Sequence, residues 1–368
     1  MHMKRISIAL VAALSVAGCS NPMSPSSLPV QNGAARPSLT MALSFKVYTA
    51  GQTPGFPVSA SAFDIAPGPN GTMWFTDDGT PAIGRIAADG TFTDFTAGLP
   101  AGAAPYAIAA GPDGNMWFSD FRGVALGSVT PSGKITEFSL SQYTDTKAMS
   151  IAFVRGKPWI VGFGVPALLA HLTPGGSLVA HSLPGQFTPS GSLAADAHAN
   201  LFFNGTNIHL RAQLVERPYD ADQLIRFPMH MHLSEVICCP NRAPRQMVLG
   251  PDGNPWFTTI DWGHKNSGAN YLGTFRAGTV RLARISNKGL SEVAYPSGIA
   301  AGTNSLWLTG SDPFAAKGAL WHIDLKGNPK AYDLPYNPQG LAVDGAGHPW
   351  FTTFWSGLPS QIVEVLSR

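Results

Sequence analysis

Apolar and polar positions recur along the chain in a fixed order. An apolar pair is followed by a turn rich in Gly, Pro and Asp and then by a second apolar pair, as in 65–75 and again in 108–118. Successive copies lie 42–54 residues apart, and each centres on one large aromatic residue: Trp74, Trp117, Trp159, Phe202, Trp256, Trp307 or Trp350. Seven copies at such a period indicate a repeat architecture.

Each copy predicts four short strands. Two strands flank the turn, a third has the form apolar-x-x-apolar, as in 83–86, and a fourth alternates after a Gly-containing turn, as in 134–138. The same pattern places the third strands of units 4 and 5 at 224–227 and 282–285. Short strands joined by such turns pair antiparallel. Four of them repeated seven times predict an all-β fold, a seven-bladed β-propeller.

Two further details fit a closed ring. The residue after the first apolar position is Ala in six units and Val248 in one, as expected where the innermost strands crowd the axis. The seventh unit ends at Arg368 after its third strand, at 362–365, whereas 44–48 has the pattern of a lone fourth strand. We therefore expect the N-terminal strand to close the last blade and cover its free edge.

Residues 1–18 have the features of a lipoprotein signal peptide. Two basic residues precede the apolar run 6–17, which is too short to span a bilayer. The run leads into Val16-Ala17-Gly18-Cys19, which resembles the bacterial lipobox, so we expect a lipid on Cys19, with simple secretion as the alternative. Because Ser20 is not Asp, the outer membrane is the expected location. We expect the Pro- and Ser-rich segment 19–43 to be a flexible tether, which leaves 44–368 as the predicted propeller.

Composition limits the choice of partner. Only 12% of residues are charged, while 40 Gly and 31 Pro favour many turns over helical bundles. A net charge of +2 provides no basic field for nucleic acid. We expect a monomer that binds a small cyclic peptide or other ligand and touches the membrane only through its lipid. Besides Cys19, the adjacent Cys238 and Cys239 could form a vicinal disulfide or remain two thiols.

Gly111–Asp120 and Val129–Phe138 resemble the repeat of the virginiamycin B lyase (streptogramin lyase) family, and the resemblance extends over 44–368. It implies an enzyme that opens a cyclic depsipeptide by carbon–oxygen elimination, with a histidine base and Mg²⁺ held by glutamates. Family members commonly carry Glu three residues after the repeat aromatic. The seven equivalents here are Asp77, Asp120, Gly162, Gly205, Thr259, Gly310 and Thr353. The alternative is a non-catalytic propeller that binds a ligand or a protein at the cell envelope.

The loops after second strands and before first strands share one face of a propeller, which we call the mouth face. Its longest loops are predicted at 206–222 and from Thr259 to about 279. The predicted base is His264, with Asp120 and Asp261 as metal ligands, although an exposed loop histidine and a turn-capping aspartate are the alternatives. The predicted ligand contacts are Arg122, Arg245, Trp262, Gln339 and Trp355. His230 and His232 are expected on the opposite face, as surface residues.

Overall fold

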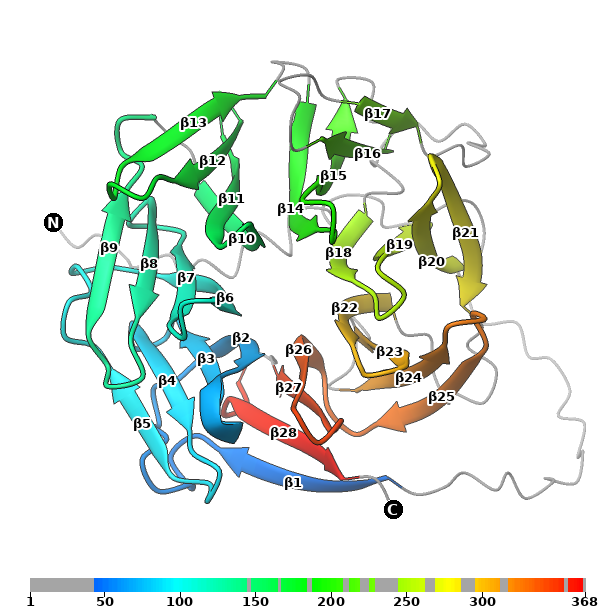
Figure 1. Cartoon of the computed structure of the whole chain (residues 1–368). Coiled ribbons are helices and arrows are strands. Elements are labelled where there is room, and N and C mark those ends of the chain that lie inside the picture. The colour runs from blue at the N-terminus through cyan, green and yellow to red at the C-terminus, as the bar shows by residue number, and fades with distance from the viewer. Residues whose placement is uncertain are drawn as a thin grey trace, which may run out of the picture.

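The computed structural model describes residues 43–143, 147–164, 167–183, 187–207, 212–218, 225–228, 244–261, 269–285, 295–311, 317–353 and 357–366. The strands in these ranges form seven sheets of four antiparallel strands. The sheets stand as blades around one axis, each with its first strand innermost (Figure 1). This confirms the predicted seven-bladed β-propeller.

The strands follow one another from the axis outward in every blade. Blade 1 contains β2 (Ala62–Pro67), β3 (Met73–Asp77), β4 (Ala82–Ile86) and β5 (Phe92–Phe95). Blade 2 contains β6 (Pro105–Ala110), β7 (Met116–Asp120), β8 (Ala125–Val129) and β9 (Ile135–Ser139). Blade 3 contains β10 (Lys147–Val154), β11 (Lys157–Phe163), β12 (Leu168–Leu172) and β13 (Leu178–Ser182). Blade 4 contains β14 (Phe187–Ala195), β15 (Leu201–Asn207), β16 (Ala212–Arg217) and β17 (Ile225–Pro228).

The remaining blades have the same order. Blade 5 contains β18 (Pro244–Leu249), β19 (Pro255–Asp261), β20 (Ala269–Arg276) and β21 (Thr279–Ile285). Blade 6 contains β22 (Tyr295–Ala301), β23 (Ser305–Ser311), β24 (Gly318–Asp324) and β25 (Pro329–Leu334). Blade 7 contains β26 (Pro338–Val343), β27 (Pro349–Thr353), β28 (Gln361–Leu366) and β1 (Ser44–Thr49).

The N-terminal strand closes the ring as predicted. β1 pairs antiparallel with β28 over its whole length, from Ser44 opposite Leu366 to Thr49 opposite Gln361. Figure 1 shows the blue β1 along the outer side of the red β28. The two ends of the described chain thus share one sheet, so the edge of the last blade is paired instead of exposed.

Two strand predictions were wrong. In blades 4 and 5 the segments 224–227 and 282–285 belong to fourth strands, β17 and β21, whereas the third strands are β16 and β20. The described residues of the loops predicted at 206–222 and from Thr259 to about 279 are therefore mostly strand. In blade 5 a two-residue turn, Ala277-Gly278 with φ of 49° and 75°, joins β20 to β21 as a tight hairpin. The placement of His230 and His232 opposite the mouth depended on this error, and both lie outside the described residues.

The repeat aromatics wedge neighbouring blades together. Trp74 of blade 1 is 1% exposed and packs in one cluster with Ile108 and Phe118 of blade 2. Phe75 is also fully buried, and its ring occupies the space beside Gly84 on β4, where any Cβ would overlap it. The same arrangement recurs at Gly127 beside Phe118. The core therefore consists of layers between blades, and the aromatics have the structural role that their period predicts.

Buried hydroxyl groups join adjacent blades near the axis. Thr76 Oγ1 accepts a hydrogen bond from the N–H of Asp64 in its own blade and donates one of 2.9 Å to the carbonyl of Tyr106 in the next. Thr352 of blade 7 likewise donates to the carbonyl of Phe63 in blade 1, at 2.7 Å. These bonds hold the first strands in a fixed relation around the ring.

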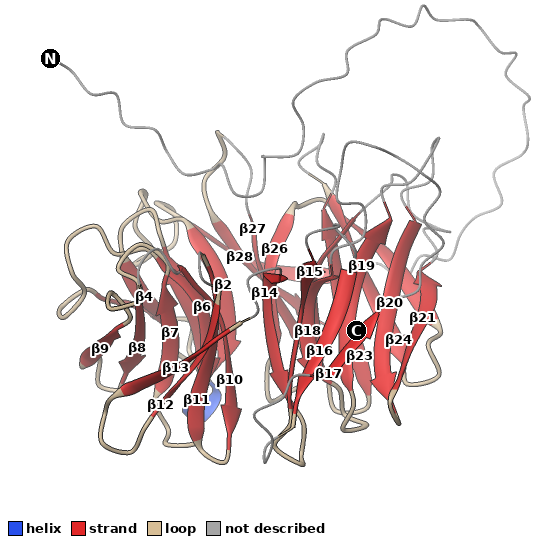
Figure 2. Ribbon diagram, turned by 90° about the horizontal axis from the view of Figure 1, so that it is seen from above, coloured by secondary structure: helices blue, strands red, loops and turns tan. Residues whose placement is uncertain are grey.

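The two faces of the ring differ in their connections (Figure 2). On one face lie the turns between first and second strands, which include a short 3-10 helix, η1 (Pro69–Gly71); we call it the turn face. The mouth face lies opposite. Among the described residues, no helix is long and apolar enough to cross a membrane.

Candidate functional site

A bulge opens every first strand near its start, on the mouth face. The pairing with the second strand shifts between Ala62 and Ile65 in blade 1 and between Pro105 and Ile108 in blade 2, and the other five blades show equivalent shifts. Bulges of this kind re-aim side chains and are common beside functional sites. Here they direct one set of residues to the mouth face around the axis.

Three aromatic rings line this face across blades 1 and 2. The ring of Phe63 lies 4.4 Å from that of Tyr106, which lies 5.5 Å from that of Phe121, measured between centroids. The ammonium of Lys147, from blade 3, stands 5.9 Å from the Phe121 centroid. All four residues are half-buried. We call Phe63, Tyr106 and Phe121 the aromatic strip.

Sequence reasoning missed this strip because it assigned the aromatics of the repeat to the core. A signal was present: Phe63 and Tyr106 occupy the same position of units 1 and 2, two residues before the buried Ile65 and Ile108. Arg245 and Gln339, which were predicted as ligand contacts, occupy this same position in units 5 and 7.

Gln339 follows the buried Pro338 on β26 and is half-buried. Its side-chain oxygen Oε1 is buried without a hydrogen-bond partner. Arg122 is exposed just after β7, and its backbone N–H donates to Asp120. Arg245 lies on β18, and its side chain is outside the described residues. The ligand contacts of all three stay predictions.

Asp77 and Asp120 end the second strands of blades 1 and 2 and are fully buried. Oδ1 of Asp120 accepts hydrogen bonds from the backbone N–H groups of Ala104, Arg122 and Gly123, at 2.7–3.0 Å. Oδ1 of Asp77 accepts three such bonds at 2.8–3.2 Å. Each aspartate therefore caps the loop that follows it and ties this loop to the segment before the first strand.

The second oxygens of these carboxyl groups, Oδ2, are buried without a hydrogen-bond partner. Burial raises the pKa of Asp77 to about 6, although its three N–H donors act in the opposite direction. Near Asp120, burial together with the Asp120 charge raises the pKa of Glu137 to about 7. Burial also raises the pKa of Asp94, which lies close enough to Asp77 to raise the pKa of that residue further. The pKa values of Asp77 in blade 1 and Glu137 in blade 2 thus lie closer to neutral pH than that of an exposed carboxyl group.

Another carboxyl group, that of Asp64, lies beside the aromatic strip. Asp64 is next to Phe63 in the bulge of β2, and its Oδ2 accepts a hydrogen bond of 3.0 Å from Ile108 N in blade 2. The carboxyl group is enclosed, and burial raises its pKa to about 6. In the same way, Oε1 of Gln246 in blade 5 accepts a hydrogen bond of 3.1 Å from the backbone N–H of Ile299 in blade 6. Asp64 therefore has a structural role between blades.

Mg²⁺ requires several oxygen ligands in near-octahedral geometry. The described residues of the mouth face do not fit it: Asp77 and Asp120 are buried, and one oxygen of each is already taken by three N–H groups. Within the described ranges, one group of His and acidic residues is compact enough to hold a metal, namely Asp344, His348 and Glu364. That group lies on the turn face.

The other predicted site residues cannot be placed. Asp261 ends β19 at the mouth face, but its side chain is outside the described residues. His264, Trp262 and Trp355 lie outside them altogether, as do Cys19, Cys238 and Cys239. Their roles stay predictions.

The fold is a closed seven-bladed propeller that carries the aromatic strip on its mouth face. The sequence profile of the virginiamycin B lyase family matches residues 45–232, about half of the chain, and the chain belongs to that family. No curated protein sequence matches it.

Solved structures share this fold. A streptogramin B lyase structure superposes with a TM-score of 0.69 at 19% identity, covering 89% of this chain and 99% of that one. A catalytically inactive histidine-to-alanine variant of virginiamycin B lyase from Staphylococcus aureus with quinupristin gives 0.69 at 19% identity, over 88% and 100%. Hydrazine synthase from Kuenenia stuttgartiensis gives 0.65 at 13%, over 87% and 97%. At such identities the likeness establishes the fold alone.

Proposed function

We propose that the protein binds a cyclic peptide of the streptogramin B type on its mouth face. The observation that carries the proposal is the aromatic strip, three half-buried rings of which Tyr106 contacts both Phe63 and Phe121. Such rings are suited to hold the apolar face of a compact macrocycle. Family membership and the quinupristin-bound relative support this class of ligand.

The polar groups at the mouth complement such a ligand. Oε1 of Gln339 is a buried acceptor without a donor, and a rotation of this half-buried side chain would let it accept a hydrogen bond from an amide N–H of the ligand. Lys147 extends the strip with a positively charged ammonium group that can donate hydrogen bonds to ligand carbonyl groups. A few polar groups that orient a ligand beside an apolar surface are typical of small-molecule sites.

A second candidate function, favoured by the family match, is carbon–oxygen elimination in the bound ring. In this reaction a base removes the proton next to the ester-bearing carbon, the carbon–oxygen bond breaks, and the carboxylate leaves while a double bond forms. His264 is the proposed base, with Mg²⁺ as the family's metal. Since the described mouth-face residues do not fit Mg²⁺, ligands would have to include Asp261 or other residues beyond them.

We further propose that the protein is exported and anchored by a lipid on Cys19. The support is the sequence of 1–19 alone, with its basic start, short apolar run and lipobox-like end. A tether over 19–43 would then separate the propeller from the membrane, with the outer membrane as the expected location.

Titration with quinupristin tests the binding proposal, with calorimetry as the readout. Tyr106→Ala should weaken binding by about 1–3 kcal/mol, the range of an aromatic hot spot. Tyr106→Phe, which keeps the ring, and Lys326→Ala, on the exposed turn face, are the controls and should bind normally. If wild-type protein does not bind, or if Tyr106→Ala binds equally well, the proposal is wrong.

Incubation of the same complex with Mg²⁺ separates binding from catalysis. Elimination opens the ring without a change in mass, whereas hydrolysis would add one water, so chromatography with mass spectrometry distinguishes the two. The lyase candidate predicts an opened product of unchanged mass that His264→Ala abolishes while binding persists. An intact ring after prolonged incubation leaves binding as the function.

A further inference from the structure

One imidazole and two carboxylates converge on the turn face of blade 7. Asp344 opens the turn between β26 and β27, His348 ends it, and Glu364 lies on β28. Nδ1 of His348 is 3.3 Å from Oε1 of Glu364 and 3.6 Å from Oδ2 of Asp344. One ligand atom from each residue lies within 4.8 Å of the others. We propose that this group is a zinc site.

The local structure fixes the three residues. Oδ1 of Asp344 accepts hydrogen bonds from the backbone N–H groups of Ala346 and His348, at 2.9 Å each. Oδ2 accepts a hydrogen bond from the indole Nε1–H of Trp350, also at 2.9 Å. Glu364 is the direct antiparallel partner of Trp350. The turn and the strand pairing therefore hold the ligand atoms together before any ion binds.

The separations suit a metal better than a shared proton. Charge-assisted N–H···O bonds are typically about 2.7–2.9 Å long. Two ligands of a tetrahedral zinc, with bonds of about 2.0–2.1 Å, lie about 3.3–3.4 Å apart. The observed 3.3 and 3.6 Å fall near the second value. All three side chains are 12–28% exposed, so an ion can enter and solvent can complete its coordination.

The donor set selects zinc over magnesium. Imidazole is a ligand for zinc and related transition ions, whereas Mg²⁺ is bound through oxygen and retains several waters. The site also lies on the opposite face from the proposed ligand. It is thus separate from the metal that family chemistry would use.

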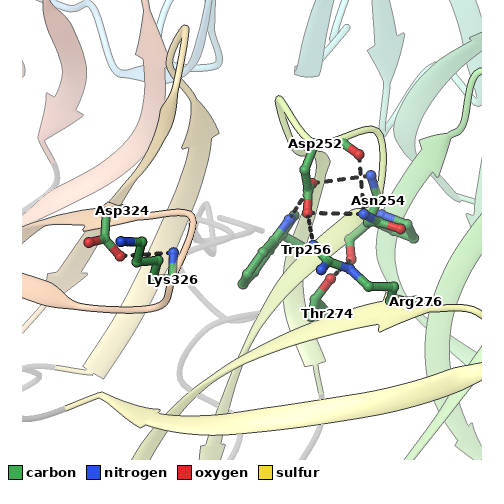
Figure 3. Close-up of polar contacts among 8 residues, drawn as sticks. Asp252, Asn254, Trp256, Thr274, Arg276, Asp324 and Lys326 are labelled. Atoms are coloured by element: carbon green, nitrogen blue, oxygen red, sulfur yellow. Dashed lines mark hydrogen bonds and ion pairs between the residues drawn. The ribbon is translucent and has the colours of Figure 1, made fainter.

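Other blades show what replaces this group. In blade 5 the Asp252 carboxylate is neutralised by Arg276, 2.6 Å away, and bonds to Asn254 and Trp256 (Figure 3). In blade 4, Asp196 and Asn200 take the places of Asp344 and His348. There the Asn200 amide donates to Oδ2 of Asp196 at 2.9 Å, and Glu216 faces Phe202 as Glu364 faces Trp350. Blade 4 is therefore a natural version of the cluster with asparagine in place of histidine.

Zinc at this position would join the turn of β26–β27 to β28, the strand that pairs with β1. Its binding should therefore stabilise the blade that closes the ring, because a ligand that binds only the folded state raises its stability.

Calorimetry of the chelator-treated full chain with Zn²⁺ tests the site. We expect one ion per chain at micromolar affinity and a rise in melting temperature, neither of them with Mg²⁺. His348→Asn should weaken binding at least about tenfold, since loss of even an indirect contact to a ligand costs about 10–100-fold. His198→Asn, in the equivalent turn of blade 4 with an 87% exposed side chain, is the matched control and should bind zinc normally.

Glu364→Gln is the second variant, should His348→Asn fail to fold, and it should weaken zinc binding as well. Circular dichroism of both variants checks the fold. Zinc binding that is equal in wild type and in a folded variant would assign the ion to other groups and overturn the proposal. Absence of zinc binding by the wild-type protein would overturn it too.

Discussion

Asp77→Asn should change how the stability of the propeller depends on pH. The Asp77 carboxyl is fully buried, and burial raises its pKa from 3.8 to about 6. Between these values the folded state binds more protons than the unfolded state. Protonation of Asp77 therefore stabilises the folded state relative to the ionised form. This contribution to the unfolding free energy is fully present below about pH 4 and is lost as the pH rises through 6.

The magnitude follows from the shift. A change of about two pKa units corresponds to about 3 kcal/mol of unfolding free energy, as an order of magnitude. Asparagine keeps one oxygen for the N–H groups of Ser61, Gly79 and Thr80 and introduces no charge. Relative to wild type, the variant should therefore gain about 2–3 kcal/mol between pH 4 and pH 7. Its amide does bury an unpaired N–H₂ group, which costs about 1–3 kcal/mol at any pH.

Urea unfolding of both proteins from pH 4 to pH 8 measures this difference. Asp78→Asn is the matched control, because the adjacent Asp78 is exposed and loses the same charge. The unfolding free energy of Asp78→Asn, plotted against pH, should run parallel to that of the wild-type protein. If the Asp77→Asn curve is also parallel between pH 4 and pH 7, the assigned pKa of Asp77 and the reasoning from burial are refuted.

Two other predictions address the ends of the chain. Deleting residues 44–49 removes β1 and exposes the edge of β28, so the melting temperature measured by calorimetry should fall strongly, and an unchanged value would contradict ring closure by this strand. Cys19→Ser should release the protein from the membrane fraction, as followed by immunoblotting, and unchanged partitioning would show that no lipid on Cys19 anchors it.

The repeats made most of the fold predictable. Seven aromatic residues at the same position of seven repeats indicate seven equivalent blades. The single strand predicted at 44–48 needed a neighbouring strand to pair with, which the last blade provides. Blades 4 and 5 failed because 224–227 and 282–285 have the apolar-x-x-apolar form expected of a third strand but belong to the fourth strands β17 and β21, although β20 carries the same form at Leu272–Phe275. The Ala277-Gly278 turn was not recognised from the sequence. The segment that forms β20 was therefore predicted to be part of a long loop.

The site was less predictable because its parts depend on register. Phe63 and Tyr106 reach the mouth only through the bulges of β2 and β6, which no local pattern announced. Asp344 and His348 meet Glu364 only because β27 pairs Trp350 with it. Asp120 ends β7 at the mouth face, where its three N–H contacts agree with the turn-capping alternative, and its role as a metal ligand stays a prediction.

Hydrogen exchange with bound quinupristin tests the central claim most directly. Saturating ligand should slow exchange at the starts of β2 and β6 and in the loop after β7, which carry the aromatic strip, and leave the turns at 68–71 and 111–114 unchanged. Protection that falls on those turns instead, or no protection at any ligand concentration, would contradict a ligand-binding mouth face.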